Sequence, residues 1–223
     1  MSKENQINIG EDFIRFHKVI TRSLEVAIQN VKEFLSAKTM EESQREGFLK
    51  FVQSFSSVVE GHHLVENEKV FPYFKDKIQD VPYERLMGQH EEIKKALDDI
   101  GSGIEILRSN GNVLNALKLI KSGLDAIDKI WLPHINIEET KLYGLVGSLE
   151  ISQEEMLRIK TDFGQFFQEH SGPVYLVMPF LLYNLSPDDR SILAQELPEN
   201  VINQLVPIDW EEEWAPMKPF LLS

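Results

Sequence analysis

Apolar residues recur at helical spacing through most of the 223-residue chain, and no convincing run alternates with the period of two that is typical of strands. The pattern therefore predicts an all-α fold. Four long stretches carry an apolar stripe that can face a common core, and they cover residues 11–36, 41–71, 86–108 and 113–147. Short connections separate them, with stop signals at Pro72, Pro82 and Ser109-Asn110-Gly111. Such connections favour an antiparallel up-and-down four-helix bundle.

The chain divides by this pattern into a bundle over residues 8–148 and a C-terminal extension over residues 149–223. We expect two or three shorter helices in the extension, separated at Gly172-Pro173, Ser186-Pro187 and near Pro198. Residues 206–223 are rich in proline and aromatic residues and predict an irregular tail. Trp210 and Trp214 in this tail either anchor it against the bundle or form a segment that binds a protein partner.

Four of the six histidines fall on the apolar stripes of four different predicted helices. His17, for example, follows Phe13 by four residues and precedes Ile20 by three, and His62, His90 and His134 occupy similar positions on the other stripes. Counting residues from each histidine to the nearest turn places all four at about the same depth in an up-and-down bundle. A single buried histidine is more often a hydrogen-bonded core residue, but four at one depth predict a site.

Two glutamates accompany these histidines at matching distances along the chain. Glu66 and Glu138 each follow a stripe histidine by four residues, a rotation of about 40° on a helix, so both are predicted to face inward. A charged carboxylate in such a position is costly without a cation. Glu139 lies one residue further along and would need a π-bulge or a long reach to join the site. We rank Glu138 above Glu139 as a ligand and keep both as candidates.

The segments 62–71 and 134–143 repeat histidine, glutamate, lysine, aliphatic and aromatic residues at the same offsets. This repeat predicts two helix hairpins that face each other about a pseudo-twofold axis. The chain has no cysteine, so a metal would be held by nitrogen and oxygen donors alone. Four imidazoles and two bridging carboxylates suit a pair of iron ions.

These residues resemble the hemerythrin-like family of HHE cation-binding proteins. The resemblance implies two non-haem iron ions, bridged by carboxylate or oxo groups, with ligands His17, His62, Glu66, His90, His134 and Glu138 or Glu139. It also implies a protein that binds, senses or reacts with oxygen, nitric oxide or peroxide, or that buffers iron.

The chain departs from the family pattern on the third helix. Oxygen-carrying hemerythrins have a further histidine four residues after the one on this helix, where this chain has Lys94. The departure suggests an altered or open coordination position at one iron ion, and Lys94 is read as a surface lysine. His63 is rotated by about 100° from His62, which predicts a place at a helix interface or behind the ligands.

Charge and hydropathy restrict the partners of the protein. A formal net charge of −13 argues against nucleic acid as a partner, because it repels phosphate backbones. The longest apolar run is short and broken by Pro179, which predicts no membrane span, and residues 1–12 lack the pattern of a signal peptide, so we expect a cytoplasmic protein. The oligomeric state is left open.

Three other functions are alternatives to this interpretation. The main alternative is a metal-free helical adaptor that binds a protein partner through its acidic surface and Trp-rich tail. A ferritin-like oxidase would need two Glu-x-x-His pairs, whereas the only pair is Glu60 with His63, and a zinc hydrolase lacks a candidate base.

Overall fold

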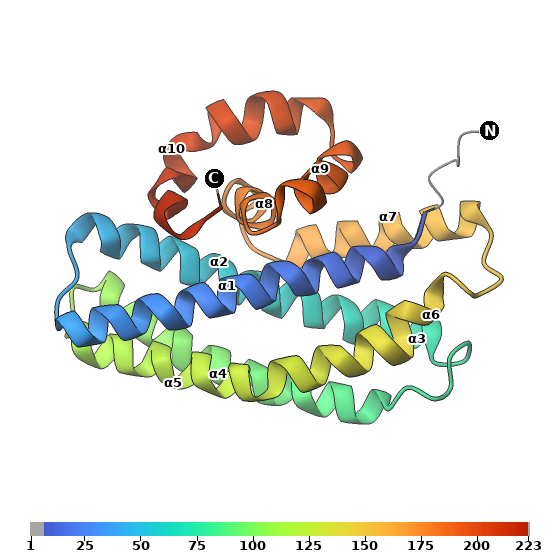
Figure 1. Cartoon of the computed structure of the whole chain (residues 1–223), viewed down its shortest axis with the longest axis horizontal. Helices are drawn as coiled ribbons and strands as arrows, with labels where there is room; N and C mark the ends of the chain where they lie inside the picture. The colour runs from blue at the N-terminus through green and yellow to red at the C-terminus, as the bar shows by residue number, and fades with distance from the viewer. Residues whose placement is uncertain (1–6, 223) are drawn as a thin grey trace.

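The computed structural model describes residues 7–222, and helices dominate this part of the chain, with no strand among the described residues. The first four long helices form an antiparallel bundle, as predicted (Figure 1). They are α1 (Ile9–Ala37), α2 (Glu42–Val65), α4 (Tyr83–Arg108) and α5 (Val113–Glu138).

The helix ends follow from local sequence. Asn8 and Asn112 cap α1 and α5 by accepting hydrogen bonds from the backbone N–H groups of Gly10 and Asn115. Asn110, in the predicted stop signal, adopts a left-handed backbone conformation with φ of 56° between α4 and α5. These signals confirm that the short connections end the helices and reverse the chain.

Two helices of the bundle continue through a π-helical turn into a short final α-helix. After α2 come the π turn η1 (Glu66–Val70) and α3 (Phe71–Phe74), and after α5 come η2 (Glu139–Tyr143) and α6 (Gly144–Val146). Both π turns begin at or next to the glutamate of a His-x-x-x-Glu segment. Such turns inside helices are frequent at functional sites, because they redirect the side chains that follow.

Helices α4 and α5 approach each other closely because glycines face the opposite backbone. A Cβ atom at Gly103 would lie 2.7 Å from the carbonyl oxygen of Ala116, and one at Gly123 would lie 2.4 Å from that of Ala96. A larger residue at either position would force the two helices apart.

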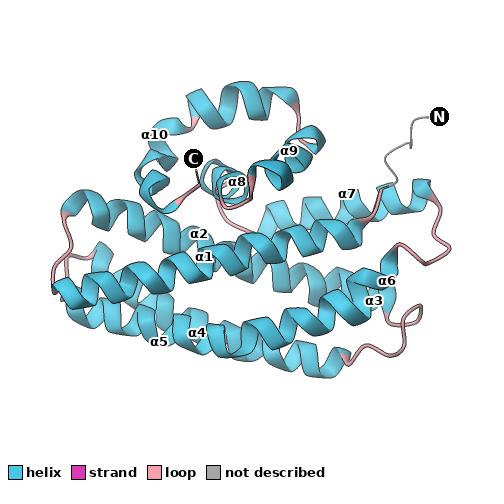
Figure 2. Ribbon diagram, in the orientation of Figure 1, coloured by secondary structure: helices cyan, strands magenta, loops and turns pink. Residues whose placement is uncertain are grey.

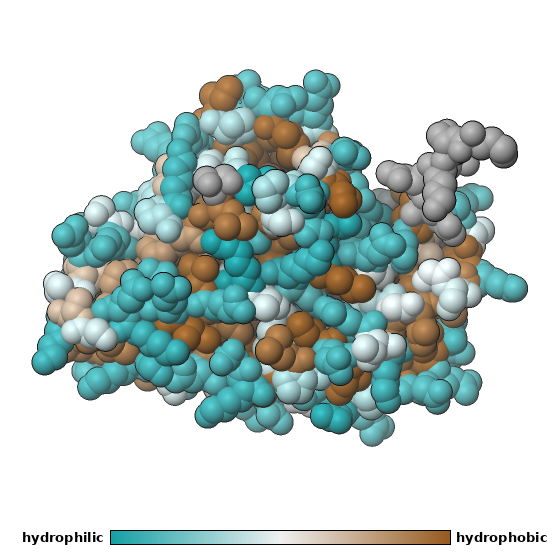
Figure 3. Space-filling model, viewed as in Figure 1, coloured by the Kyte–Doolittle hydropathy of each residue, from teal (hydrophilic) through white to brown (hydrophobic). Residues whose placement is uncertain are grey.

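The C-terminal extension covers one side of the bundle (Figure 2). It contains α7 (Gln153–His170), α8 (Val174–Tyr183) and α9 (Pro187–Glu196), which are separated at the predicted glycine, serine and proline positions. The face presented in Figure 3 intersperses hydrophilic and hydrophobic side chains over the bundle and the extension. Among the described residues, no helix combines the length and the apolar character needed to cross a membrane.

The end of the chain is more ordered than the predicted irregular tail. It forms a π-helical segment (Val201–Asp209), α10 (Glu211–Trp214) and a 3₁₀ helix (Ala215–Phe220). Trp214, Met217 and Phe220 are buried, and the indole N–H of Trp214 donates to the carbonyl of Val206. The tail prediction was wrong because packing of these apolar side chains stabilises short turns between the prolines. Trp214 packs on Tyr183 within the extension, whereas Phe220 contacts Phe48 and Phe51 of the bundle.

The core consists of two apolar clusters at different heights. The large apolar cluster fills the half of the bundle that includes the α1–α2 and α4–α5 connections; its members include Leu24, Val31, Phe51, Phe55, Ile100, Leu107, Leu117 and Leu124. The small apolar cluster lies at the other end; its members include Ile9, Phe13, Val65, Phe71, Leu86, Leu142, Tyr143 and Val146. The predicted site lies between them.

Candidate metal centre

The histidines and glutamates form a polar layer between the two apolar clusters. On α1, His17 lies between Phe13 of the small apolar cluster and Ile20 of the large one, and the histidines of α2 and α4 are flanked by the two clusters in the same way. His134 on α5 lies between the large cluster and Leu142 of the small one, which follows in η2. We call this set the His/Glu layer; it consists of His17, His62, His63, Glu66, His90, His134 and Glu138. Each of these residues is at most 5% exposed. The two apolar clusters therefore shield these side chains from bulk water on both sides.

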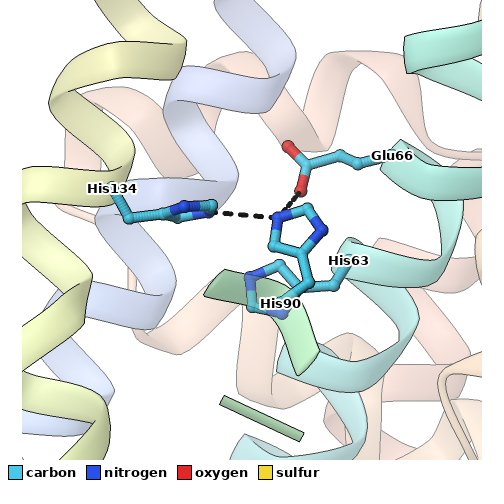
Figure 4. Close-up of side chains that lie close together, drawn as sticks. All are labelled: His63, Glu66, His90 and His134. Atoms are coloured by element: carbon cyan, nitrogen blue, oxygen red, sulfur yellow. Dashed lines mark hydrogen bonds and ion pairs between the residues drawn. The ribbon is translucent and has the colours of Figure 1, made fainter. Parts of the chain in front are cut away.

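The layer contains two groups of potential ligand atoms. His63, Glu66, His90 and His134 form one group, which we call the α4 group, and Figure 4 shows these side chains converging. His17, His62, Glu66 and Glu138 form the other, which we call the α1 group. In each group the ligand atoms all lie within 4.8 Å of one another. Glu66 belongs to both groups and so can bridge them.

Distances inside the layer match those between neighbouring ligands of one cation. The Nε2 atoms of His90 and His134 are 3.1 Å apart, and Nε2 of His134 lies 3.2 Å from Oε1 of Glu138. Nε2 of His62 and Nε2 of His90 each lie 3.4 Å from an oxygen of Glu66. Two donors bound to a cation at about 2.1 Å and at right angles are themselves separated by about 3 Å. These contacts therefore fit shared coordination.

Buried atoms without hydrogen-bond partners provide an independent test of the fit. Nε2 of His62, Nε2 of His63, Oε2 of Glu66 and both carboxylate oxygens of Glu138 are buried, and none has a partner among the described residues. Nε2 of His17 is also unpartnered, and Oε2 of Glu138 is 3.3 Å from it. Buried polar atoms are nearly always satisfied, so this concentration of unpartnered donors in one place fits a site for a cation.

Burial and contacts within the layer together set the protonation of its side chains; contacts with Glu138 and Glu139 outweigh burial at His17 and raise the pKa of this imidazole. Burial lowers the pKa of His62 and His63 well below 6.5 and that of His134 to about 4, so these imidazoles favour the neutral form that binds metal. Burial, together with the charge of Glu138, raises the pKa of the Glu66 carboxyl well above its usual range. Burial also opposes ionisation of Glu138, but contacts with His17 and His90 outweigh it and lower the pKa of this carboxyl.

The outer nitrogens of three imidazoles are held by side-chain oxygens. Nδ1 of His90 donates to Oδ1 of Asn67 at 2.8 Å, and Nδ1 of His134 donates to Oε1 of Gln89 at 3.2 Å. Nδ1 of His17 donates to Oε1 of Glu139 at 2.9 Å. These bonds place the proton on Nδ1 and leave Nε2 of each ring free to face the layer, which is the arrangement typical of metal-binding histidines. The hydroxyl of Tyr143 also donates to Oε1 of Glu66.

Comparison with known proteins agrees with this geometry. The hemerythrin HHE cation-binding domain matches residues 9–146, more than half of the chain, and the matched segment contains the whole His/Glu layer. The chain belongs to the hemerythrin HHE cation-binding family. Neither the curated proteins nor the solved structures compared with the chain gave a match. Membership of the family and the buried His/Glu layer together indicate cation binding.

The structure brings the predicted ligands of this HHE domain together, with one division among the glutamates. Glu138 faces the layer and is fully buried, whereas Glu139 binds the outer nitrogen of His17 and belongs to neither ligand group. A π turn, η2, does begin at Glu139, but the Glu139 side chain still joins neither ligand group. Its observed place is behind His17, where it orients the imidazole.

His63 is the residue that the sequence analysis left outside the ligand set. Its ring stacks on that of His90 at 4.0 Å between centroids, and it is part of the α4 group. A signal was present, because His63 precedes Glu66 by three residues and therefore lies beside it on the helix. Glu60, by contrast, is exposed, so Glu60 and His63 do not both face the core. His170, the remaining histidine, is also exposed.

Proposed function

We propose that this HHE domain binds two iron ions that share the carboxylates of Glu66 and Glu138. His63, His90 and His134 would hold one ion, and His17 and His62 the other. The proposal is carried by one observation, namely that two groups of buried donors meet at a common carboxylate. Imidazole and carboxylate donors suit iron, and the chain has no thiolate that would favour a softer metal site.

The two ions would differ in how many protein donors they receive. The ion in the α4 group would have three imidazoles, and the ion in the α1 group only two. The third imidazole of the α4 group would come from His63 on α2, while Lys94, the position of the absent family histidine, is exposed. We therefore place the open coordination position at the ion held by His17 and His62.

Iron with an open position supplies a binding site for a small ligand such as oxygen, nitric oxide or peroxide. The chain contributes a dry layer, because the two apolar clusters exclude water from above and below. It also contributes fixed imidazoles, through the bonds to Asn67, Gln89 and Glu139. We propose that binding, sensing or reacting with such a ligand is the function, with iron buffering as the alternative.

The test begins with the iron content of the purified protein and of three variants. His62→Ala and His134→Ala each remove a donor from a different group and should lower bound iron per chain. His170→Ala is the matched control, because His170 is exposed and its ring bonds only the carbonyl of Phe166. Iron at the wild-type level in both site variants would refute the assignment.

Absorption spectra then separate ligand binding from buffering. The spectrum of the reduced protein should change when nitric oxide or air is admitted, if a ligand reaches the iron. An iron-loaded protein whose spectrum stays constant under both gases would favour buffering. A colourless protein that folds fully in chelator would instead favour the adaptor, although the burial of Trp214 removes one surface on which that alternative depended.

A further inference from the structure

A cavity of about 150 Å³ lies between the bundle and the C-terminal extension. Its floor comes from α1 and α2, with Phe13, Phe16 and Val19 among the lining residues, and its roof comes from α7, α8 and α9. The roof belongs to the part of the chain beyond residue 146, outside the segment that matches the HHE domain. The cavity is therefore produced by the extension and is a feature of this chain.

The lining indicates a small apolar occupant. Apart from a few charged groups at the rim and one imidazole, the side chains that line the cavity are aromatic or aliphatic. Apolar cavities of about this volume bind small apolar molecules or xenon. Because the cavity is smaller than pockets for drug-sized ligands, which start at about 300 Å³, a small molecule fits better than a large one.

The rim favours an uncharged occupant. Nζ of Lys160 on α7 lies 2.8 Å from Oδ2 of Asp12 on α1 and 2.9 Å from Oε1 of Glu196 on α9. Arg15 donates to Oδ1 of Asp12 at 2.9 Å. The two acidic and two basic groups at the rim thus pair with one another, which favours an uncharged occupant over an ion.

The imidazole in the cavity wall is that of His62, a member of the α1 group. The ring of Phe16 stacks on it with a centroid distance of 6.1 Å and an angle of 3°. Nε2 of the same imidazole lies 3.4 Å from Glu66 inside the layer. One side chain thus separates the cavity from the ion to which we assign the open position.

We propose that this cavity binds a small neutral apolar molecule, of the size of oxygen or nitric oxide, and supplies it to the metal centre past His62. The supply step depends on the proposed function, whereas the binding step depends only on the cavity. The two steps can therefore be tested separately.

Xenon is the probe for the binding step. Crystals of the full chain under xenon pressure, prepared with and without iron, should show xenon in the cavity. Gly164 lines the cavity, and a Cβ atom added there meets no other atom within 4 Å, so Gly164→Phe should fill the opening and remove the xenon peak. Leu181→Phe offers a second filling variant from the roof. Gly101→Phe is the matched control, because that glycine also faces open space but lies on α4 away from the cavity.

Nitric oxide is the probe for the supply step. In iron-loaded protein, Gly164→Phe and Leu181→Phe should slow the association of nitric oxide while iron content and the final spectrum stay the same, and Gly101→Phe should match the wild type. Absence of xenon from the wild-type cavity would overturn the binding site. Xenon binding with unchanged association rates in both filling variants would overturn the supply role. A protein that holds no iron would refute the proposed function and leave the xenon result standing.

Discussion

The large apolar cluster and the His/Glu layer are neighbours in one bundle, yet they are stabilised in different ways. In the apolar cluster, side chains such as Phe55 and Leu124 are fully buried among other hydrocarbon groups, and burial itself is favourable. In the layer, Glu66 and Glu138 are buried just as completely, and burial of a carboxylate is unfavourable unless it is paired. The same four helices thus combine a region that is stabilised by apolar packing alone with a region whose buried carboxylates favour a bound cation.

The largest expected effect comes from removing the carboxylate shared by both ligand groups. Glu66→Gln keeps the shape of the side chain and an oxygen that can accept from Tyr143, but it removes the anionic donor. We expect loss of most bound iron, measured by metal analysis, with no loss of metal-free stability, measured by denaturant titration in chelator. Glu68→Gln is the control, because Glu68 is exposed two residues away. Wild-type iron in Glu66→Gln would contradict the bridging role.

The converse change belongs in the large apolar cluster. Phe55→Ala should lower the free energy of unfolding by about 3–5 kcal/mol, because it removes a fully buried ring and leaves a cavity. Iron per folded chain should stay at the wild-type level. A parallel loss of iron would show that iron binding in the His/Glu layer is coupled to packing of the large apolar cluster.

A smaller effect is expected from residues that orient the imidazoles without joining the ligand groups. Asn67→Leu removes the acceptor for Nδ1 of His90 and should weaken metal affinity by about 10–100-fold, measured by competition with a chelator. Asn136→Leu serves as the control, since Asn136 is exposed. Equal affinities of the two variants would mean that the bond to His90 has no influence on the metal.

The smallest effect is predicted for Lys94, which occupies the position of the absent family histidine. Lys94→Ala should leave iron content unchanged and alter the free energy of unfolding by less than about 0.5 kcal/mol, because the side chain is exposed. His63→Ala should lower iron content, because the imidazole belongs to the α4 group. If His63→Ala kept its iron and Lys94→Ala lost it, the third imidazole of that group would have to come from another residue.

The periodic sequence predicted most of the fold and much of the layer, because both depend on which face of a helix a residue occupies. His17, His62, His90 and His134 lie on apolar stripes, and all four meet where residue counting placed them. His63 was harder to place, because a helix packed on several sides presents more than one stripe to the interior. The observed bond of Glu139 to the back of His17 depends on the π turn, and the turns of the tail depend on packing against α2; neither is visible in local sequence.

Anomalous diffraction at the iron absorption edge, from crystals of iron-replete protein, locates the iron ions directly. We predict two peaks inside the bundle, one beside His63, His90 and His134 and the other beside His17 and His62, with Glu66 and Glu138 between them. Imidazoles that surround only protein and water, with no peak in the His/Glu layer, would refute a metal centre in this bundle.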